Sequence, residues 1–347
     1  MFKTGLNWVN LGFRGLAILL ALVFATLVMV FSQAPPLEAY RHIIAGSVGT
    51  TVRITNVLVV WTPLIMATAG LLLTFTAGLW NIGIEGQITL GAIFSTWALR
   101  LLQYSDLPPA LIMFAGVIAG ALGGMIWASM VGLLKIFGNV NEIFGGLGLN
   151  FVATALTIWL IFGPWKRPGV GSMSGTEPFP TELWFPVFLD YRLSLWSLGM
   201  GVAAIILVYF LLKGTYFGLR LKAVGRNSRA AFLMGIPTTR YLMLSFLLCG
   251  ALAGLAGATQ VLGVYYRLIP AISSGYGFLG LLVAMLINYQ VLWVAPVAFF
   301  FAALNIGSIQ LPIVLKLDST LSGVLQGALV LFVLIMEGVR RRLIRDR

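Results

Sequence analysis

The stretch Lys213–Arg240 reads KGTYFGLRLKAVGRNSRAAFLMGIPTTR and lies between two long apolar runs. It holds six basic residues and no acidic residue. Short loops rich in Lys and Arg stay on the cytoplasmic side of a membrane protein. The stretch therefore predicts a cytoplasmic loop between two membrane spans. The alternative interpretation is that its basic residues do no more than set the orientation of the chain.

The same loop carries the signals of a short helix. Asn227 or Ser228 can cap such a helix by accepting a hydrogen bond from a backbone N–H. The helix would run over Arg229–Met234 and end at Gly235, and its two adjacent alanines would let a partner approach closely. A short capped helix in a cytoplasmic loop is suited to docking on another protein.

The composition indicates the class of protein. The chain has 347 residues, of which 60% are hydrophobic and 9% charged, whereas soluble domains carry about 25% charged residues. We expect an all-α, polytopic integral membrane protein with one membrane domain over residues 1–347. The net charge of +12 is concentrated in loops and at the C-terminus, where membrane orientation explains it better than nucleic-acid binding does.

Hydropathy predicts about ten spans, so both termini should lie on one side, and the basic tail Arg340–Arg347 places that side in the cytoplasm. The loop Gly163–Arg192, with Glu177, Glu182 and Asp190, would be extracytoplasmic. Five spans in each half would allow inverted five-helix repeats. The expected spans are Leu16–Phe31, Val57–Ala77, Ile82–Leu102, Ala110–Leu134, Ile143–Phe162, Leu193–Leu212, Tyr241–Val264, Gly275–Ile287, Trp293–Ile309 and Leu321–Met336.

Several kinds of chemistry are disfavoured by the sequence. The single histidine, His42, excludes a multi-histidine metal site, and we expect no metal. The single cysteine, Cys249, lies in an apolar run, which predicts a buried and inert thiol. No GxxxxGK[ST] phosphate loop occurs, so this chain should bind no cofactor and hydrolyse no ATP itself. An enzyme is therefore disfavoured.

One acidic residue adjoins a long apolar span without a basic neighbour. This residue, Glu85, lies in the segment NIGIEGQ, and acids in membrane segments are usually functional. Glycines among polar residues suit a tight turn or a broken helix. Glu85 could cap backbone amides at a hinge near the cytoplasmic face, or act in the transport path or in partner contact. The residues of interest are Asn81, Gly83, Glu85, Gly86 and Gln87.

Other polar residues in or beside the spans are uncharged. Such groups fit a path for a neutral polar solute better than a path for an ion. The alternative for each of them is a hydrogen bond between helices. The candidate pathway residues are Asn150, Gln260 and Asn288.

Four stretches, taken together, resemble a known family. They are Asn81–Gln87, Val140–Glu142 with Asn150, Leu219–Asn227 with Ala230, Ala231, Gly235 and Ile236, and Gly275–Phe278. In this order they resemble the membrane permeases of ABC importers of the nucleoside-uptake type, within the wider family that serves simple sugars and branched-chain amino acids. The chain departs from the family pattern at Arg226, at Ser228, at Gly145–Gly148 and at Ile287.

The resemblance implies a ten-span permease in the plasma (inner) membrane of a prokaryote. It implies a second permease chain, identical or related, and two cytoplasmic ATPases that hold the ATP. It also implies an extracytoplasmic binding protein that delivers a nucleoside. The alternatives are a simple-sugar permease of this family, or a self-sufficient ion-coupled secondary transporter. The residues expected to couple to the ATPase are Arg220, Lys222, Gly225, Arg226, Asn227, Ala230, Ala231 and Gly235.

Overall fold

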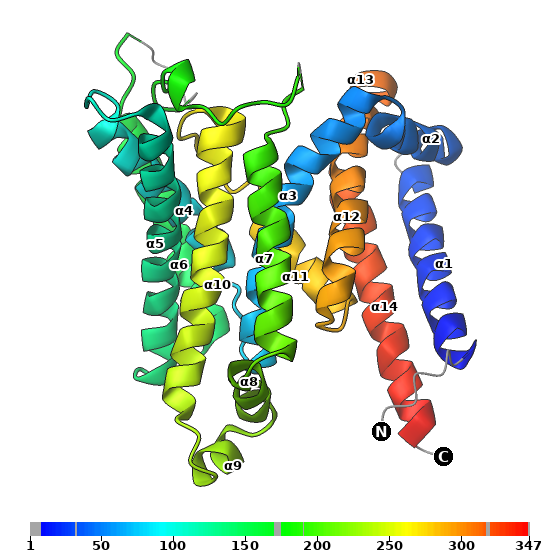
Figure 1. Cartoon of the computed structure of the whole chain (residues 1–347). Coiled ribbons are helices and arrows are strands. Elements are labelled where there is room, and N and C mark those ends of the chain that lie inside the picture. The colour runs from blue at the N-terminus through cyan, green and yellow to red at the C-terminus, as the bar shows by residue number, and fades with distance from the viewer. Residues whose placement is uncertain (1–7, 32, 170–174, 190, 317–319, 346–347) are drawn as a thin grey trace. The chain divides into compact units, whose positions relative to one another are not determined.

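The structure is a computed structural model that describes residues 8–31, 33–169, 175–189, 191–316 and 320–345. Within these residues the regular elements are all helices (Figure 1). Parts of the expected extracytoplasmic loop (170–174 and Asp190) and of the basic tail (346–347) lie outside the described residues. The helices are α1 Trp8–Phe31, α2 Pro36–Val48, α3 Thr51–Thr76, α4 Ile84–Leu102, α5 Pro109–Ile136, α6 Glu142–Phe162, η1 Thr181–Leu183, α7 Leu195–Lys213, α8 Tyr216–Arg226, α9 Ser228–Leu233, α10 Thr238–Gln260, η2 Val261–Tyr265, α11 Tyr276–Leu286, η3 Val291–Trp293, α12 Val294–Ser308, α13 Gln310–Leu315 and α14 Leu321–Arg345.

The chain divides into two compact units. The large unit is Leu58–Phe299, and the small unit combines Met1–Val57 with Phe300–Arg347. In the small unit α1 packs along α14, and the rings of Phe24 and Phe332 lie 5.8 Å apart. The start of α1 and the end of α14 lie at the same end of this unit (Figure 1).

The core of the large unit is the contact among α4, α5 and α10. A lipid environment supplies no hydrophobic force between helices, so close contact requires small residues. Gly254 of α10 lies against Gly120 and Gly124 of α5, so closely that a Cβ at Gly254 would collide with their backbone atoms. The glycine pattern Gly250-x-x-x-Gly254 is therefore a helix contact.

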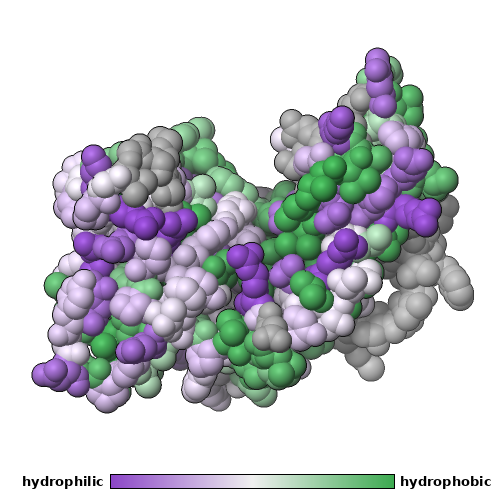
Figure 2. Space-filling model, turned by 90° about the horizontal axis from the view of Figure 1, so that it is seen from above, coloured by the Kyte–Doolittle hydropathy of each residue, from purple (hydrophilic) through white to green (hydrophobic). Residues whose placement is uncertain are grey.

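Two loops of the large unit lie at its opposite ends. Helices α8 and α9 form one end, and the segment that contains η1 forms the other (Figure 1). There the Phe179 N–H donates to the Tyr266 carbonyl at 2.9 Å, and the Phe185 N–H donates to the Leu262 carbonyl at 2.9 Å. Figure 2 views the molecule from above, on the end that contains η1, and shows many hydrophilic residues on that face.

Six helical segments among the described residues are long and apolar enough to cross a membrane, or seven if a bent pair counts as one span. The bent pair is Leu19–Phe31 with Pro36–Val48, at 113°. Helix α11 has only 11 residues and extends about 16 Å, about half of a hydrocarbon core of about 30 Å. The expected span at Gly275–Ile287 therefore cannot cross alone. Ten spans, inverted repeats and a single domain remain predictions.

Candidate functional site

The joint between α3 and α4 covers residues 77–83, and the segment NIGIEGQ spans its last part and the first turn of α4. Gly78 turns the chain with φ +78°, and α4 begins at Ile84. The side-chain amides of Asn81 and Gln87 are fully buried and donate to each other, at 3.1 and 3.0 Å. Asn81 Nδ2 also lies 3.1 Å from Cys249 Sγ of α10. These bonds hold the joint in one shape and connect it to α10.

Asn150 of α6 supports the start of α4. Its Oδ1 accepts from the Gly86 N–H at 2.8 Å, and its Nδ2 donates to the Ile82 carbonyl at 3.0 Å. The first N–H groups of a helix lack partners within that helix, and a buried backbone group must find one elsewhere. Both polar atoms of the Asn150 side chain therefore bind backbone groups near the start of α4. This agrees with the alternative that Asn150 forms a hydrogen bond between helices.

Glu85 stabilises the start of α11. Its Oε1 accepts from the Gly275 N–H at 3.0 Å, and its Oε2 accepts from the Gly277 N–H at 2.8 Å. The residue at the N-cap of α11 is Gly275, which has no side chain to do this. A negative charge is also favourable at a helix N-terminus. The interpretation that Glu85 caps backbone amides is therefore confirmed, and a role in the transport path stays a prediction.

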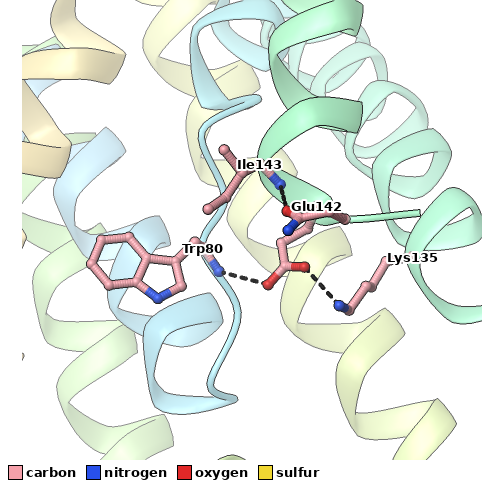
Figure 3. A network of polar contacts seen from close by, with 5 residues as sticks. Trp80, Lys135, Glu142 and Ile143 are labelled. Atoms are coloured by element: carbon pink, nitrogen blue, oxygen red, sulfur yellow. Dashed lines mark hydrogen bonds and ion pairs between the residues drawn. The ribbon is translucent and has the colours of Figure 1, made fainter. Parts of the chain in front are cut away.

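A second acidic residue holds the α3–α4 joint from the side of α6. Glu142 pairs with Lys135 at the end of α5, with Nζ and Oε2 2.7 Å apart (Figure 3). Its Oε1 lies 3.5 Å from the Trp80 N–H in the joint. Nearby, the side chain of Asn141 caps α6 by accepting from the Ile143 N–H at 2.9 Å. The turn between α5 and α6 is thus tied to the joint.

The stretch Lys213–Arg240, predicted to be a cytoplasmic loop, forms two helices, α8 and α9. Asn227, rather than Ser228, caps α9, because its Oδ1 accepts from the Ala230 N–H at 3.0 Å. Gly235 follows the helix with φ +81°. The expectation that both alanines face a partner is wrong for Ala231, whose side chain is 3% exposed. Ala231 packs within this chain, and Ala230 is exposed.

Two basic residues of the loop contact their own chain. Lys222 Nζ donates to the carbonyl of Leu212 in the last turn of α7, where a cation is favourable. Arg220 Nη1 donates to the Tyr241 hydroxyl of α10 at 3.2 Å. Both side chains therefore fix α8 to the bundle, whereas Arg226 at the end of α8 is exposed.

Helix α8 also meets the α3–α4 joint directly. Gly225 lies against the Thr76 carbonyl oxygen and the backbone of Gly78. A Cβ at Gly225 would collide with that carbonyl, and a Cβ at Gly78 would lie 3.0 Å from the Gly225 oxygen. Backbone therefore touches backbone at this contact, and a movement of α8 must displace the joint.

The other candidate residues lie apart from this cluster. Asn288 is exposed in the turn after α11, with φ +50°. Gln260 is buried at the end of α10. Sequence reasoning missed Gly146, which touches Gly83, and Trp127, which lies beside Gly86. The glycines at 145–148, where the family has bulkier residues, could have indicated the close contact between Gly146 and Gly83.

A chain whose described regular elements are all helices, six of them long and apolar enough to cross a membrane, is a multi-pass membrane protein. The family comparison is more specific. The chain belongs to the branched-chain amino acid transport system / permease component family, whose model matches residues 53–334.

Three of the similar proteins, each described as an ABC transporter permease, show what this chain resembles. A glucose ABC transporter permease protein of Haloferax volcanii is 29% identical, with 96% of this chain and 90% of the relative covered. A guanosine ABC transporter permease protein of Bacillus subtilis is 28% identical, covering 94% and 93%. A nucleoside ABC transporter permease protein of Lactococcus lactis is 26% identical, covering 85% and 81%. The chain is therefore an ABC-importer permease, a transporter component rather than an enzyme.

Proposed function

We propose that this chain is the membrane permease of an ATP-driven importer for nucleosides in a prokaryotic plasma membrane. Its partners would be a cytoplasmic ABC ATPase, which holds the ATP, a second permease chain and an extracytoplasmic binding protein. Both termini would be cytoplasmic. The observation that carries the solute class is the alignment over nearly the whole of both chains with a permease described as a guanosine transporter.

Simple sugars are the second candidate solutes. The Haloferax volcanii relative, described as a glucose permease, is as similar as the guanosine permease, at 29% against 28% identity. Both solutes are neutral and carry several hydroxyl groups. Of the uncharged candidate residues, Gln260 has an unpaired side-chain amide among the described residues, which agrees with a neutral polar solute of either kind.

The exposed side of α8 and α9 is the proposed docking surface for the ATPase. Its residues are largely apolar, with exposed fractions of 64–85%: Tyr216, Leu219, Phe232, Leu233 and Met234. Arg226 and Arg229 are also exposed. Apolar side chains gathered at one end of a membrane protein, beside basic residues, favour burial by a protein partner. The contact of Gly225 with Gly78 would pass a movement of the ATPase into the α3–α4 joint.

The test is uptake by proteoliposomes that contain the permease pair, with and without the cognate ATPase. Because transport would be driven by ATP, uptake should require the ATPase and ATP. Uptake under an ion gradient without the ATPase would instead indicate a secondary transporter. Competition of labelled guanosine by unlabelled nucleosides, sugars and amino acids then gives the solute class. Uptake of labelled glucose without uptake of labelled guanosine would favour the sugar alternative.

A further inference from the structure

A small cavity lies in the large unit, near the end opposite α8 and α9. It is bounded by α3, by the start of α7 and by the junction of α10 with η2. Its volume is about 10 Å³, about the space that one water molecule requires. The residues that matter here are Pro63, Arg192, Ser194, Ser197, Thr259 and Gln260.

Three side chains around this cavity are buried and unpaired. Among the described residues, neither Nε2 nor Oε1 of Gln260 has a hydrogen-bond partner, and the same holds for the hydroxyls of Ser194 and Ser197. Their exposed fractions are 1%, 2% and 8%. A buried polar group without a partner is unfavourable, and such groups are rare in native proteins. A guest that forms hydrogen bonds in the cavity would satisfy these groups.

The other hydroxyls of the cavity are already used. Thr62 donates to the Leu58 carbonyl at 2.9 Å, and Thr259 donates to the Ala256 carbonyl at 2.8 Å. Gln260 thus offers both a donor and an acceptor, flanked by two serines. The single charged group, Arg192, is exposed rather than buried. This set suits a neutral hydroxyl or amide group and has no buried charge to pair with an anion.

The backbone around the cavity is irregular. Immediately after Gln260 the chain forms the π-helix η2, which ends at Tyr266 in a left-handed conformation. Pro63 lies inside α3 on the other side of the cavity, and α3 stays helical there. Single π turns are frequent at functional sites, and proline removes a helical hydrogen bond. A π turn and a proline therefore both lie beside the cavity.

We propose that this cavity is a solute subsite, in which Gln260 and Ser197 bind one hydroxyl or amide group of the solute during its passage. The inference rests on the proposed import function and adds the group by which the permease recognises its solute. The space fits one functional group in the described conformation, rather than a whole nucleoside.

The test is a thermodynamic cycle that removes the Gln260 side-chain amide from the permease and, separately, one polar group from the solute. Uptake of guanosine is compared with that of inosine and of the 2′-, 3′- and 5′-deoxy forms of guanosine, in wild type and in Gln260→Leu. The wild type should prefer guanosine over one analogue by about three- to tenfold, the effect of one hydrogen bond. In Gln260→Leu the preference should be smaller by that factor. Discrimination by the binding protein is common to both chains and cancels from the ratio.

Ser245→Ala is the matched control, because Ser245 is a buried serine of the same helix whose hydroxyl already donates to Leu242 at 2.7 Å. It should keep every preference of the wild type. If Gln260→Leu does not reach the membrane, Ser197→Ala enters the same cycle. Preferences retained in the variant would overturn the subsite and leave a water-filled cavity. If the wild type imports neither guanosine nor glucose, the proposed solute class fails before the cycle begins.

Discussion

At the scale of single residues, the polar side chains of NIGIEGQ are occupied within the protein. Asn81 and Gln87 bind each other, and Glu85 binds the start of α11. Asn150 binds the backbone on both sides of Gly83. These residues therefore determine the geometry of the α3–α4 joint. Buried polar atoms without a partner among the described residues include Trp127 Nε1, which lies beside Gly86, and the side chains of Gln260, Ser194 and Ser197.

The first prediction concerns the two acceptors of Glu85. Glu85→Gln should lower uptake in part, because glutamine keeps one acceptor oxygen and presents an NH₂ group to the other backbone N–H. Glu85→Ala should lower it much further, because hydrogen bonds to a charged group contribute about 1.5–3 kcal/mol. Uptake per permease molecule in the membrane is the measurement. Complete and equal loss in both variants, at normal expression, would favour a role that depends on charge.

At the scale of helices, α8 links the docking surface to the joint. It is fixed to α7 and α10 through Lys222 and Arg220, and it touches the joint through Gly225. A helix held at three places moves as a rigid body, so α8 can transmit displacement without a long-range network.

The second prediction therefore concerns Gly225→Ala. The added methyl must displace α8 from the Thr76 carbonyl, at a cost of about 1–3 kcal/mol. Uptake and solute-stimulated ATPase activity should fall, while the ATPase still co-purifies, because the docking surface is unchanged. Gly148→Ala adds the same methyl where nothing lies within 4 Å and should have little effect. Normal coupling in Gly225→Ala would exclude this contact as the transmission point.

The third prediction tests the docking surface itself. Leu233 is 85% exposed in α9, and Leu233→Asp would place a charge in the interface with the ATPase, at a cost of several kcal/mol if unpaired. The ATPase should no longer co-purify, and the permease should remain in the membrane. Leu189→Asp makes the same change at the other end of the large unit, at a residue 69% exposed, and should retain the ATPase. Retention by Leu233→Asp as well would place docking elsewhere.

At the scale of the whole molecule, the basic loop and the segment around η1 lie at opposite ends of the large unit. This separation agrees with the predicted topology, in which the loop 163–192 is extracytoplasmic and the loop 213–240 is cytoplasmic. The hydrophilic residues at the loop end seen in Figure 2 are in keeping with a face outside the membrane.

The fourth prediction assigns these ends to the two sides of the membrane. In a Cys249→Ser background, which keeps an acceptor for Asn81, single cysteines replace Glu182 and Ser228. A membrane-impermeant maleimide should label Glu182→Cys in intact cells, and Ser228→Cys only after permeabilisation. Both positions are exposed in the structure. The reverse labelling pattern would contradict the topology.

The helical membrane class, most helix positions and the capped helix α9 could be predicted from the sequence. Apolar runs and loop charge report on the solvent around a segment, and capping depends on residues close in the chain. The family to which the chain was predicted to belong is confirmed by the family comparison. The local signals also suggested that Glu85 caps backbone amides, although not whose amides they are.

Contacts between distant segments were decided by the tertiary structure alone. Glu85 lies 190 residues before the Gly275 N–H that it binds, and no local pattern indicates such a pairing. Hydropathy counted α11 as a span, although its 11 residues end too soon. The sequence around α9 does not indicate which of its two alanines faces inward, because burial there depends on how α9 packs against α8 and α10. Whether a polar residue such as Asn150 or Gln260 is paired or free depends on the helices that pack around it.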